Sequence, residues 1–163
     1  MGKITAPEPF TPAHRIGDFD CGADSLNYWL KKYALKNEAA GASRTFVVCS
    51  NQQIIGYYTL AAGSVAQQET PGKVKRKMPD PIPVMILGRL AVDKQWQAKG
   101  IGKGLLKDAL LRTLSVSEQV GIRAVLVHAL SEEAKDFYLR HGFAESPIDP
   151  LTLMLRLQDI HLP

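Results

Sequence analysis

The chain has few cysteines and no long apolar run. Only Cys21 and Cys49 occur in 163 residues, and they show no metal-binding spacing, so we expect two reduced thiols, no bound metal and a cytoplasmic protein. No apolar stretch approaches the roughly 18 residues that a transmembrane helix needs. The first ten residues contain two prolines and no apolar core, which argues against a secretory signal. We therefore expect no membrane partner.

Acidic residues are scarce in one stretch. Between residues 71 and 104, eight basic residues are opposed only by Asp80 and Asp93, so this stretch carries +6 and the rest of the chain carries −2. Such a field favours a polyanion such as a nucleic acid; a solvated surface loop is the alternative. For Arg89, a carboxylate partner inside the sheet is a second alternative. The candidates for contact with RNA phosphates are Arg44, Lys73, Lys75, Arg76, Lys77 and Arg89.

Apolar periodicity predicts one α/β domain over residues 1–163 with a mixed sheet. We expect helices at residues 24–39, 101–116 and 131–140, and strands at 45–49, 54–61, 84–92, 123–130 and 151–157. The first two strands form a hairpin across a polar link. Residues 63–83 contain four prolines and are expected to form a long surface loop. Ser131 can cap the last helix, because a serine hydroxyl accepts from backbone amides there.

A glycine-rich run, Gln97-Ala98-Lys99-Gly100-Ile101-Gly102, separates the strand at 84–92 from the helix that follows it. A turn of this kind directs backbone N–H groups outward at the positive end of a helix dipole. The sequence therefore indicates a phosphate or pyrophosphate ligand, although glycines that merely permit a tight turn are the alternative.

The spacing of the glycines separates three kinds of phosphate loop. A Walker loop is excluded because Lys103 is followed by Gly104 and not by Ser or Thr. A dinucleotide fingerprint fits poorly, because the glycines at 100, 102 and 104 do not follow G-x-G-x-x-G and Glu118 lies in a polar stretch. The third pattern, Q/R-x-x-G-x-G/A, matches in full.

These residues carry a family resemblance. Residues 87–106, LGRLAVDKQWQAKGIGKGLL, resemble the acetyl-coenzyme A site of the GNAT acetyltransferases, and residues 129–143, ALSEEAKDFYLRHGF, resemble the second cofactor motif. The segments TAPEP, RTFVV, PDPIPV, GRLAVD, VHALSEEAKDFY and HGF are similar to acetyltransferase toxins of bacterial type II toxin–antitoxin modules. The resemblance covers nearly the whole chain. It implies a GNAT-type mixed central sheet flanked by helices, with a splayed strand pair that holds the cofactor.

The resemblance also implies an acyl donor and its binding residues. Acetyl-CoA would lie along the strand at 84–92, and its pyrophosphate would bind at the glycine-rich run. Tyr138 matches the catalytic tyrosine, and Ser131 stands where many members carry Asn. The implied cofactor-binding residues are Leu90, Ala91, Val92, Gln97, Ala98, Lys99, Gly100, Ile101, Gly102, Lys103, Ser131 and Phe137.

The chemistry of acyl transfer can be matched to these residue types. A phenol with a pKa near 10 can protonate a departing thiolate, which suits Tyr138; a packed core tyrosine is the alternative. No general base stands out, since His128 ends a strand that reads as buried. An α-amino group has a pKa near 7.7–8.0 and a lysine amine one near 10.4, so the missing base favours an α-amine acceptor.

We therefore expect a toxin that transfers an acetyl group from acetyl-CoA to the α-amino group of aminoacyl-tRNA and so blocks translation. One alternative is a GNAT enzyme that acetylates a small amine or a protein N-terminus. Another is a catalytically silent module that binds a nucleic acid or a partner protein. The resemblance further implies a homodimer and an antitoxin with a ribbon-helix-helix DNA-binding domain, whose C-terminal tail covers the basic face.

Overall fold

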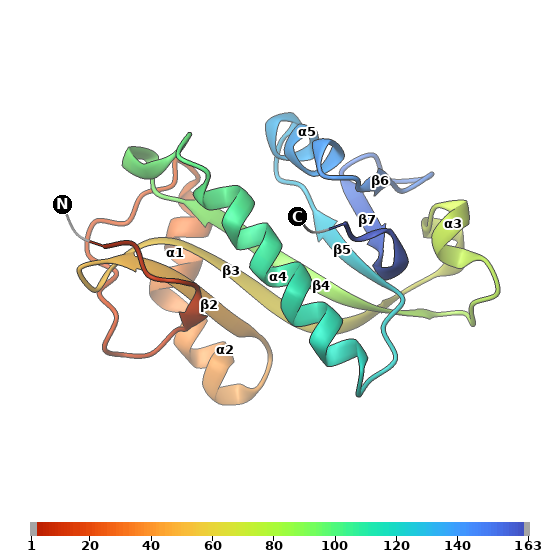
Figure 1. Cartoon of the computed structure of the whole chain (residues 1–163), viewed down its shortest axis with the longest axis horizontal. Helices are drawn as coiled ribbons and strands as arrows, with labels where there is room; N and C mark the ends of the chain where they lie inside the picture. The colour runs from red at the N-terminus through yellow and green to blue at the C-terminus, as the bar shows by residue number, and fades with distance from the viewer. Residues whose placement is uncertain (1–2, 162–163) are drawn as a thin grey trace. The chain divides into compact units, whose positions relative to one another are not determined.

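Seven strands form a mixed sheet in the order β1-β2-β3-β4-β5-β7-β6 (Figure 1). The computed structural model describes residues 3–161. The strands are β1 (Glu8–Pro9), β2 (Arg44–Ser50), β3 (Gln53–Val65), β4 (Ile82–Val92), β5 (Ala124–His128), β6 (Ala144–Glu145) and β7 (Thr152–Arg156). The helices are α1 (Asp24–Lys32), α2 (Ala34–Ala40), α3 (Gly72–Lys75), α4 (Ile101–Ser117) and α5 (Glu132–Arg140). The α/β class and the order of the predicted elements are confirmed.

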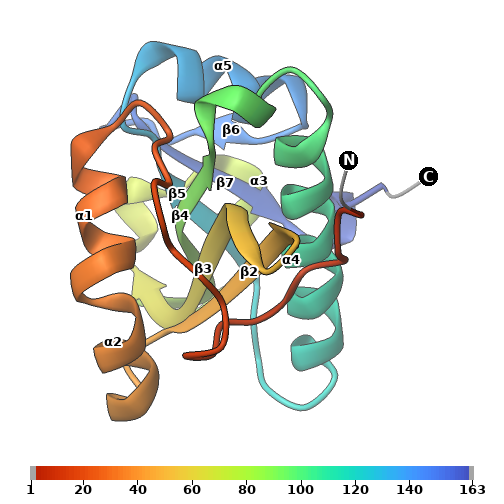
Figure 2. The same cartoon turned by 90° about the vertical axis from the view of Figure 1, so that its left-hand side faces the viewer.

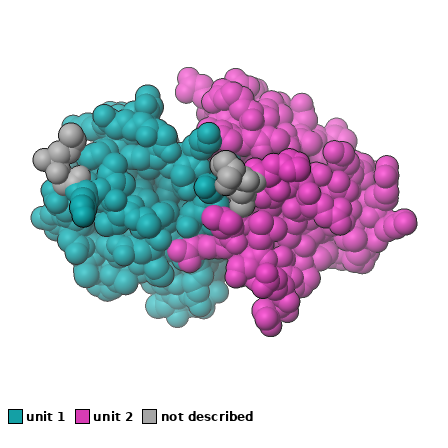
Figure 3. Space-filling view, in the orientation of Figure 1, with its two compact units in different colours: residues 1–61, 88–109 teal, residues 62–87, 110–163 magenta. Residues whose placement is uncertain are grey.

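The chain divides into two compact units, coloured separately in Figure 3. Unit 1 comprises residues 1–61 and 88–109, and unit 2 comprises residues 62–87 and 110–163. The elements β3, β4 and α4 run from one unit into the other. The expectation of a single domain over residues 1–163 stays a prediction.

In unit 1, helices cover both faces of the strands (Figure 2). Adjacent residues on β3 show this, because successive side chains of a strand point to opposite faces. The Tyr57 hydroxyl donates to the Leu26 carbonyl of α1 at 2.7 Å, and its ring stacks on Trp29. The Tyr58 hydroxyl donates instead to Asp108 of α4. Both tyrosines are fully buried, so the α1 and α4 layers are each tied to the same strand.

Two local features of unit 1 were only partly predicted. The β2–β3 hairpin is confirmed, and it turns at Asn51 and Gln52, both with positive φ, as a tight two-residue hairpin turn requires. The helix expected at 24–39 is instead two helices. Tyr33 separates them with a φ of −118°, far from the usual helical value, while its amide donates to the Trp29 carbonyl at 2.8 Å. The second helix ends at Gly41 in the left-handed region, as expected.

In unit 2, the expectation of a surface loop over residues 63–83 is wrong for much of its length. β3 continues to Val65, a short 3₁₀ turn follows at Gln67–Glu69, and α3 places Val74 in a buried cluster with Ile82 and Met154. Burial of Val74 is the physical reason, because one apolar side chain among lysines can anchor a turn of helix to the core.

The remaining elements follow the predictions with shifted ends. The Ser131 hydroxyl accepts from the Ala134 amide at 3.1 Å, which confirms the expected cap of α5. β4 pairs in parallel with β5 as far as Leu87 opposite Val127, and β4 then continues to Val92 without pairing with β5. In the described chain, residues 3–161, no helix combines the length and apolarity needed to cross a membrane.

Candidate active site

The glycine-rich run forms a turn that ends in the first residues of α4; we call residues 97–102 the glycine turn. Ala98 (φ 63°) and Gly100 (φ 82°) both adopt left-handed backbone geometry. The first hydrogen bond of the helix runs from the Gly104 amide to the Gly100 carbonyl at 3.0 Å. The amides of residues 101–103 therefore have no acceptor within the helix. Together with the positive end of the helix dipole, they form a site suited to a phosphate group.

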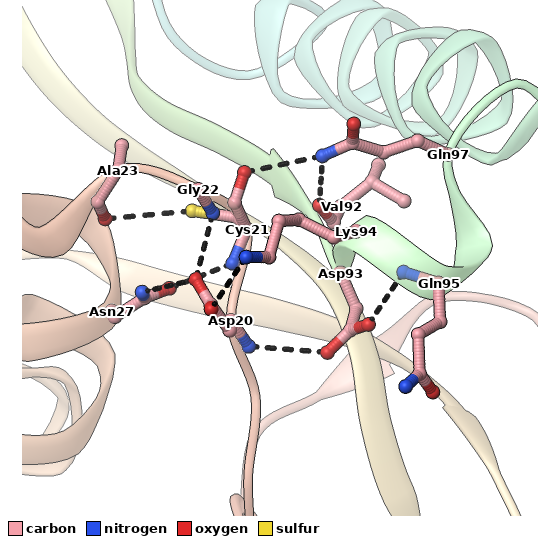
Figure 4. Close-up of polar contacts among 10 residues, drawn as sticks. All are labelled: Asp20, Cys21, Gly22, Ala23, Asn27, Val92, Asp93, Lys94, Gln95 and Gln97. Atoms are coloured by element: carbon pink, nitrogen blue, oxygen red, sulfur yellow. Dashed lines mark hydrogen bonds and ion pairs between the residues drawn. The ribbon is translucent and has the colours of Figure 1, made fainter.

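The Gln97 side chain holds the glycine turn in place (Figure 4). Its amide nitrogen donates to the Val92 carbonyl at 2.8 Å and to the Cys21 carbonyl at 3.1 Å. One side chain thus joins the turn to the end of β4 and to the segment that precedes α1. These side-chain hydrogen bonds give Gln97 a positioning role within the protein, and its expected part in cofactor binding stays a prediction.

A second set of polar contacts fixes the chain between β4 and the glycine turn (Figure 4). Asp93 accepts from the Gln95 amide at 2.9 Å and from the Asp20 amide at 3.1 Å. The Asp20 carboxylate pairs with Lys94 at 3.1 Å. The Gly22 amide, followed by Asn27 and Lys94, lowers the pKa of Asp20 to about 2. Sequence reasoning missed this network, since Asp20 and Asp93 are far apart in the chain.

The remaining proposed cofactor contacts of unit 1 lie on β4 and α4. Ala91 is buried, and Leu90 and Val92 are half-buried at the end of β4. Lys99 and Lys103 are exposed, so their ammonium groups can approach an anion at the glycine turn from solvent. The structure thus places residues 97–103 together, in the glycine turn and the first turn of α4, and their role in cofactor binding stays a prediction.

The candidate catalytic tyrosine lies in unit 2, on α5. Tyr138 is 7% exposed, and its ring packs against Phe137 and Phe143 with ring centroids 5.2 and 5.3 Å apart. Within residues 3–161 its hydroxyl has no hydrogen-bond partner. Burial raises the pKa of Tyr138 above its ordinary value of 10, so the phenol keeps its proton at neutral pH. This packing suits both a core tyrosine and an acid.

Two other unit 2 side chains have local partners. The Ser131 hydroxyl is engaged by the Ala134 amide. His128 is exposed, so the expectation of a buried histidine is wrong; it is the last residue of β5, where the strand leaves the core. Its Nδ1 lies 2.9 Å from the hydroxyl of Thr152, which donates in turn to Asp149.

Four of the predicted RNA contacts lie in one segment of unit 2, residues 73–77, which we call the basic segment. Their side chains are exposed. Arg123 donates to the Lys73 and Val74 carbonyls, each at 2.9 Å, and Gln67 donates to the Met78 carbonyl at 2.7 Å. Sequence reasoning missed Arg123 and Gln67. The basic segment is held at both ends, and its four side chains are Lys73, Lys75, Arg76 and Lys77.

The other two predicted RNA contacts lie in unit 1. The Arg89 guanidinium carbon is 4.0 Å from the centroid of the Trp29 ring, and burial lowers its pKa. In the described part of the chain no carboxylate pairs with Arg89. Arg44 is exposed, and its guanidinium contacts Glu38 at 2.7 Å.

One group of potential metal ligands occurs among the described residues: Glu8, His14 and Cys49, with ligand atoms within 4.8 Å of one another. His14 already has two partners, since Nδ1 accepts from the Thr11 amide at 3.0 Å and Nε2 lies 2.9 Å from Glu8. Burial raises the pKa of Cys49 to about 11, so the thiol is protonated at neutral pH. The hydrogen bonds of His14 are thus made within the N-terminal segment, to Thr11 and Glu8.

Comparison with known proteins identifies the family to which the glycine turn and the α/β fold belong. Residues 41–145 match the model of the acetyltransferase (GNAT) domain. The chain is 46% identical over 98% of its length to a tRNA-acetylating toxin of Mycobacterium tuberculosis, of which it covers 96%.

Two solved structures are also similar. AtaT complexed with acetyl-methionyl-tRNAfMet is 30% identical with a TM-score of 0.89, and 96% of each chain is covered. A mutant AtaT toxin bound to acetyl-CoA and the C-terminus of the antitoxin AtaR is 29% identical with a TM-score of 0.81, covering 95% of this chain and 94% of that one. The chain therefore belongs to the GNAT family of acetyltransferases.

Proposed function

We propose that the chain is a toxin that transfers an acetyl group from acetyl-CoA to the α-amino group of aminoacyl-tRNA and so blocks translation. The glycine turn is the observation that carries this proposal. Its left-handed residues, and the amides at the start of α4 that have no acceptor within the helix, are suited to a pyrophosphate, and the acyl donor contains one. The relatives described above are named for the same substrates.

The basic segment supports the choice of an RNA acceptor. Four exposed cationic side chains lie on a stretch whose backbone is fixed by Arg123 and Gln67. Contacts between cations and phosphates supply affinity without reading sequence. We propose that residues 73–77 and Arg89 bind the tRNA backbone, and that Arg44, whose charge is shared with Glu38, contributes less.

Acyl transfer requires an acid that returns a proton to the departing sulfur. Acetyl-CoA supplies an activated thioester. We propose that the amine attacks the thioester carbonyl and that the Tyr138 hydroxyl donates its proton to the thiolate as the carbon–sulfur bond breaks. The proton that the amine loses when the amide forms then restores the phenol, so the step releases the amide and a neutral thiol. A burial-raised pKa keeps this acid protonated at the pH where the acceptor amine is neutral, so both reactants are in the required state together.

The acceptor needs little help from a base. The α-amino group of an amino acid has a pKa near 7.7–8.0, and esterification to tRNA lowers it further by withdrawing electrons. A fair fraction of the amine is therefore neutral at cellular pH. This property separates an aminoacyl ester from a lysine side chain, whose pKa near 10.4 would require a base.

We also propose the partners that such a toxin needs. A cognate antitoxin would bind the chain through a C-terminal tail, by analogy with the AtaT–AtaR complex, and its ribbon-helix-helix domain stays a prediction. The homodimer likewise stays a prediction. Because charged tRNA is used in translation, the proposed location is the cytoplasm.

The decisive experiment incubates the purified protein with total charged tRNA and labelled acetyl-CoA. We expect label in the aminoacyl group, recovered as N-acetyl amino acid after mild hydrolysis. Uncharged tRNA, polyamines and peptides with free N-termini serve as parallel acceptors. Label in polyamines or peptides with none in charged tRNA would overturn the proposed acceptor. Absence of coenzyme A binding by calorimetry would overturn the proposed donor.

A further inference from the structure

Aromatic and cationic side chains are exposed along α1, α2 and the residue between them, Tyr33. Tyr28 is 54% exposed and Tyr33 is 44% exposed, and their rings meet edge to face with centroids 5.8 Å apart. Lys31, Lys32 and Lys36 are exposed on the same two helices. Because residues three and four apart on a helix are neighbours, Tyr28 lies beside Lys31 and Lys32. We call these five residues the tyrosine–lysine face.

The charges of this face are uncompensated. Within residues 3–161, none of the three lysines makes an ion pair. The acidic side chain nearest to them in α2, Glu38, is engaged by Arg44 at 2.7 Å and by the Thr45 amide at 3.0 Å. Asp24, in the first turn of α1, is the remaining acid on these helices. The face therefore combines three cationic side chains with two exposed aromatic rings.

We propose that the tyrosine–lysine face binds unpaired nucleotides of the charged tRNA, an inference that rests on the proposed function. Unpaired bases stack on exposed aromatic rings, and neighbouring lysines neutralise their phosphates. A paired stem would offer only phosphates, and an apolar protein partner would leave three ammonium groups facing apolar surface. The combination of rings and unpaired lysines favours single-stranded RNA.

The basic segment, in unit 2, has no exposed aromatic residue. The basic segment then supplies charge alone. The tyrosine–lysine face supplies stacking and charge. Substitutions in it should therefore weaken the use of an acceptor that contains RNA and leave an acceptor without RNA unaffected.

The test compares Tyr28→Leu, which removes the ring, with Tyr28→Phe, which keeps it. A triple variant, Lys31→Gln with Lys32→Gln and Lys36→Gln, removes the charge. Lys107→Gln is the matched control, because Lys107 is exposed on α4, the helix on the other face of the unit 1 strands (Figure 2). The acceptors are charged tRNA and a methionine ethyl ester, which has the α-amine but no RNA.

We expect Tyr28→Leu and the triple variant each to raise KM for charged tRNA about tenfold, with the effect confined to the RNA acceptor. Tyr28→Phe, which keeps the ring, and Lys107→Gln should both have the KM of the unmodified protein. A normal KM in Tyr28→Leu and in the triple variant would overturn the inference while leaving the proposed function intact.

Two further outcomes separate the inference from the function. If the protein acetylates no tRNA, the proposed function fails, and fluorescence anisotropy with labelled tRNA then decides the inference by comparing the same variants. If the variants change the sedimentation coefficient and leave tRNA binding unaltered, the face joins two copies of the chain, which also overturns the inference.

Discussion

Arg89 lies over the indole ring of Trp29, with 4.0 Å between the guanidinium carbon and the ring centroid. The ring holds the side chain without neutralising its charge, so an anion can still bind. We predict that Arg89→Met, which keeps the packing on Trp29, raises KM for charged tRNA several-fold with little change in melting temperature. The KM of Arg89→Lys should lie between those of the unmodified protein and Arg89→Met, because an ammonium keeps the charge but does not stack as a planar guanidinium does. An unchanged KM in Arg89→Met would remove Arg89 from the RNA site.

Tyr138 offers the most direct test of the chemistry. Tyr138→Phe removes one hydroxyl that has no hydrogen-bond partner within residues 3–161, so folding and coenzyme A binding should persist. Loss of a general acid lowers rates by about 10²-fold or more, and we predict a fall in kcat of that size on charged tRNA. Calorimetry with coenzyme A is the control for the binding site. Normal turnover in this variant would assign Tyr138 to the core alone.

The pH profile follows from the same residue. Activity requires a neutral amine and a protonated phenol, so kcat/KM should rise as the acceptor amine loses its proton, at or below about pH 8. Since burial raises the pKa of Tyr138 above 10, the acid stays protonated across this range and the profile should remain flat to at least pH 9. A decline that begins near neutral pH, in protein that circular dichroism shows to be folded, would contradict this role.

The backbone of the glycine turn gives a matched pair of variants. Ala98 and Gly100 both have left-handed φ, and a Cβ added at Gly100 would meet no atom within 4 Å. Gly100→Ala should therefore cost about 1–2 kcal/mol of backbone strain alone and weaken coenzyme A binding. Ala98→Gly should be neutral or slightly stabilising because it relieves the same strain. Melting temperatures measured with and without coenzyme A report both the stability of each variant and its binding of coenzyme A. Equal melting temperatures for the two variants would contradict the left-handed geometry assigned to these positions.

Salt dependence tests the basic segment. Each phosphate contact that is lost should reduce the slope of log affinity against log salt by about 0.7–0.9. We predict that Lys75→Gln and Arg76→Gln each reduce the salt slope of tRNA binding by about the 0.7–0.9 that corresponds to one phosphate contact. The double variant should show the sum, because both side chains are exposed. A slope identical to that of the unmodified protein would place the RNA elsewhere.

Local signals in the sequence predicted much of the fold. Ser131 and the two glutamates after it predicted the start of α5, and Gly41 predicted the end of α2. The break at Tyr33 was not predictable in this way, because the apolar spacing continues across it and no proline or glycine interrupts the pattern. The two-residue strands β1 and β6 are also too short to show a period of two.

The candidate site was predicted where its residues are neighbours in the chain. Residues 97–103 form one turn, and a motif could reveal them. The hydrogen bonds of Gln97 to Cys21, of Asp93 to Asp20 and of Arg123 to Lys73 each join segments far apart in sequence, and no local pattern encodes them. The exposure of His128 likewise depends on where β5 ends, which periodicity places only within a few residues.

The clamp of Arg123 and Gln67 on the basic segment has a thermodynamic consequence. A flexible cationic arm loses backbone freedom when it settles on RNA, at roughly 1–2 kcal/mol for each residue that becomes ordered. Here the Lys73, Val74 and Met78 carbonyls are already tied down, so this entropy is lost when the protein folds and not when it meets RNA. Encounter with the nucleic acid should then be close to rigid-body docking, and loosening the segment at Gln67, a neutral side chain, would weaken affinity without removing a positive charge.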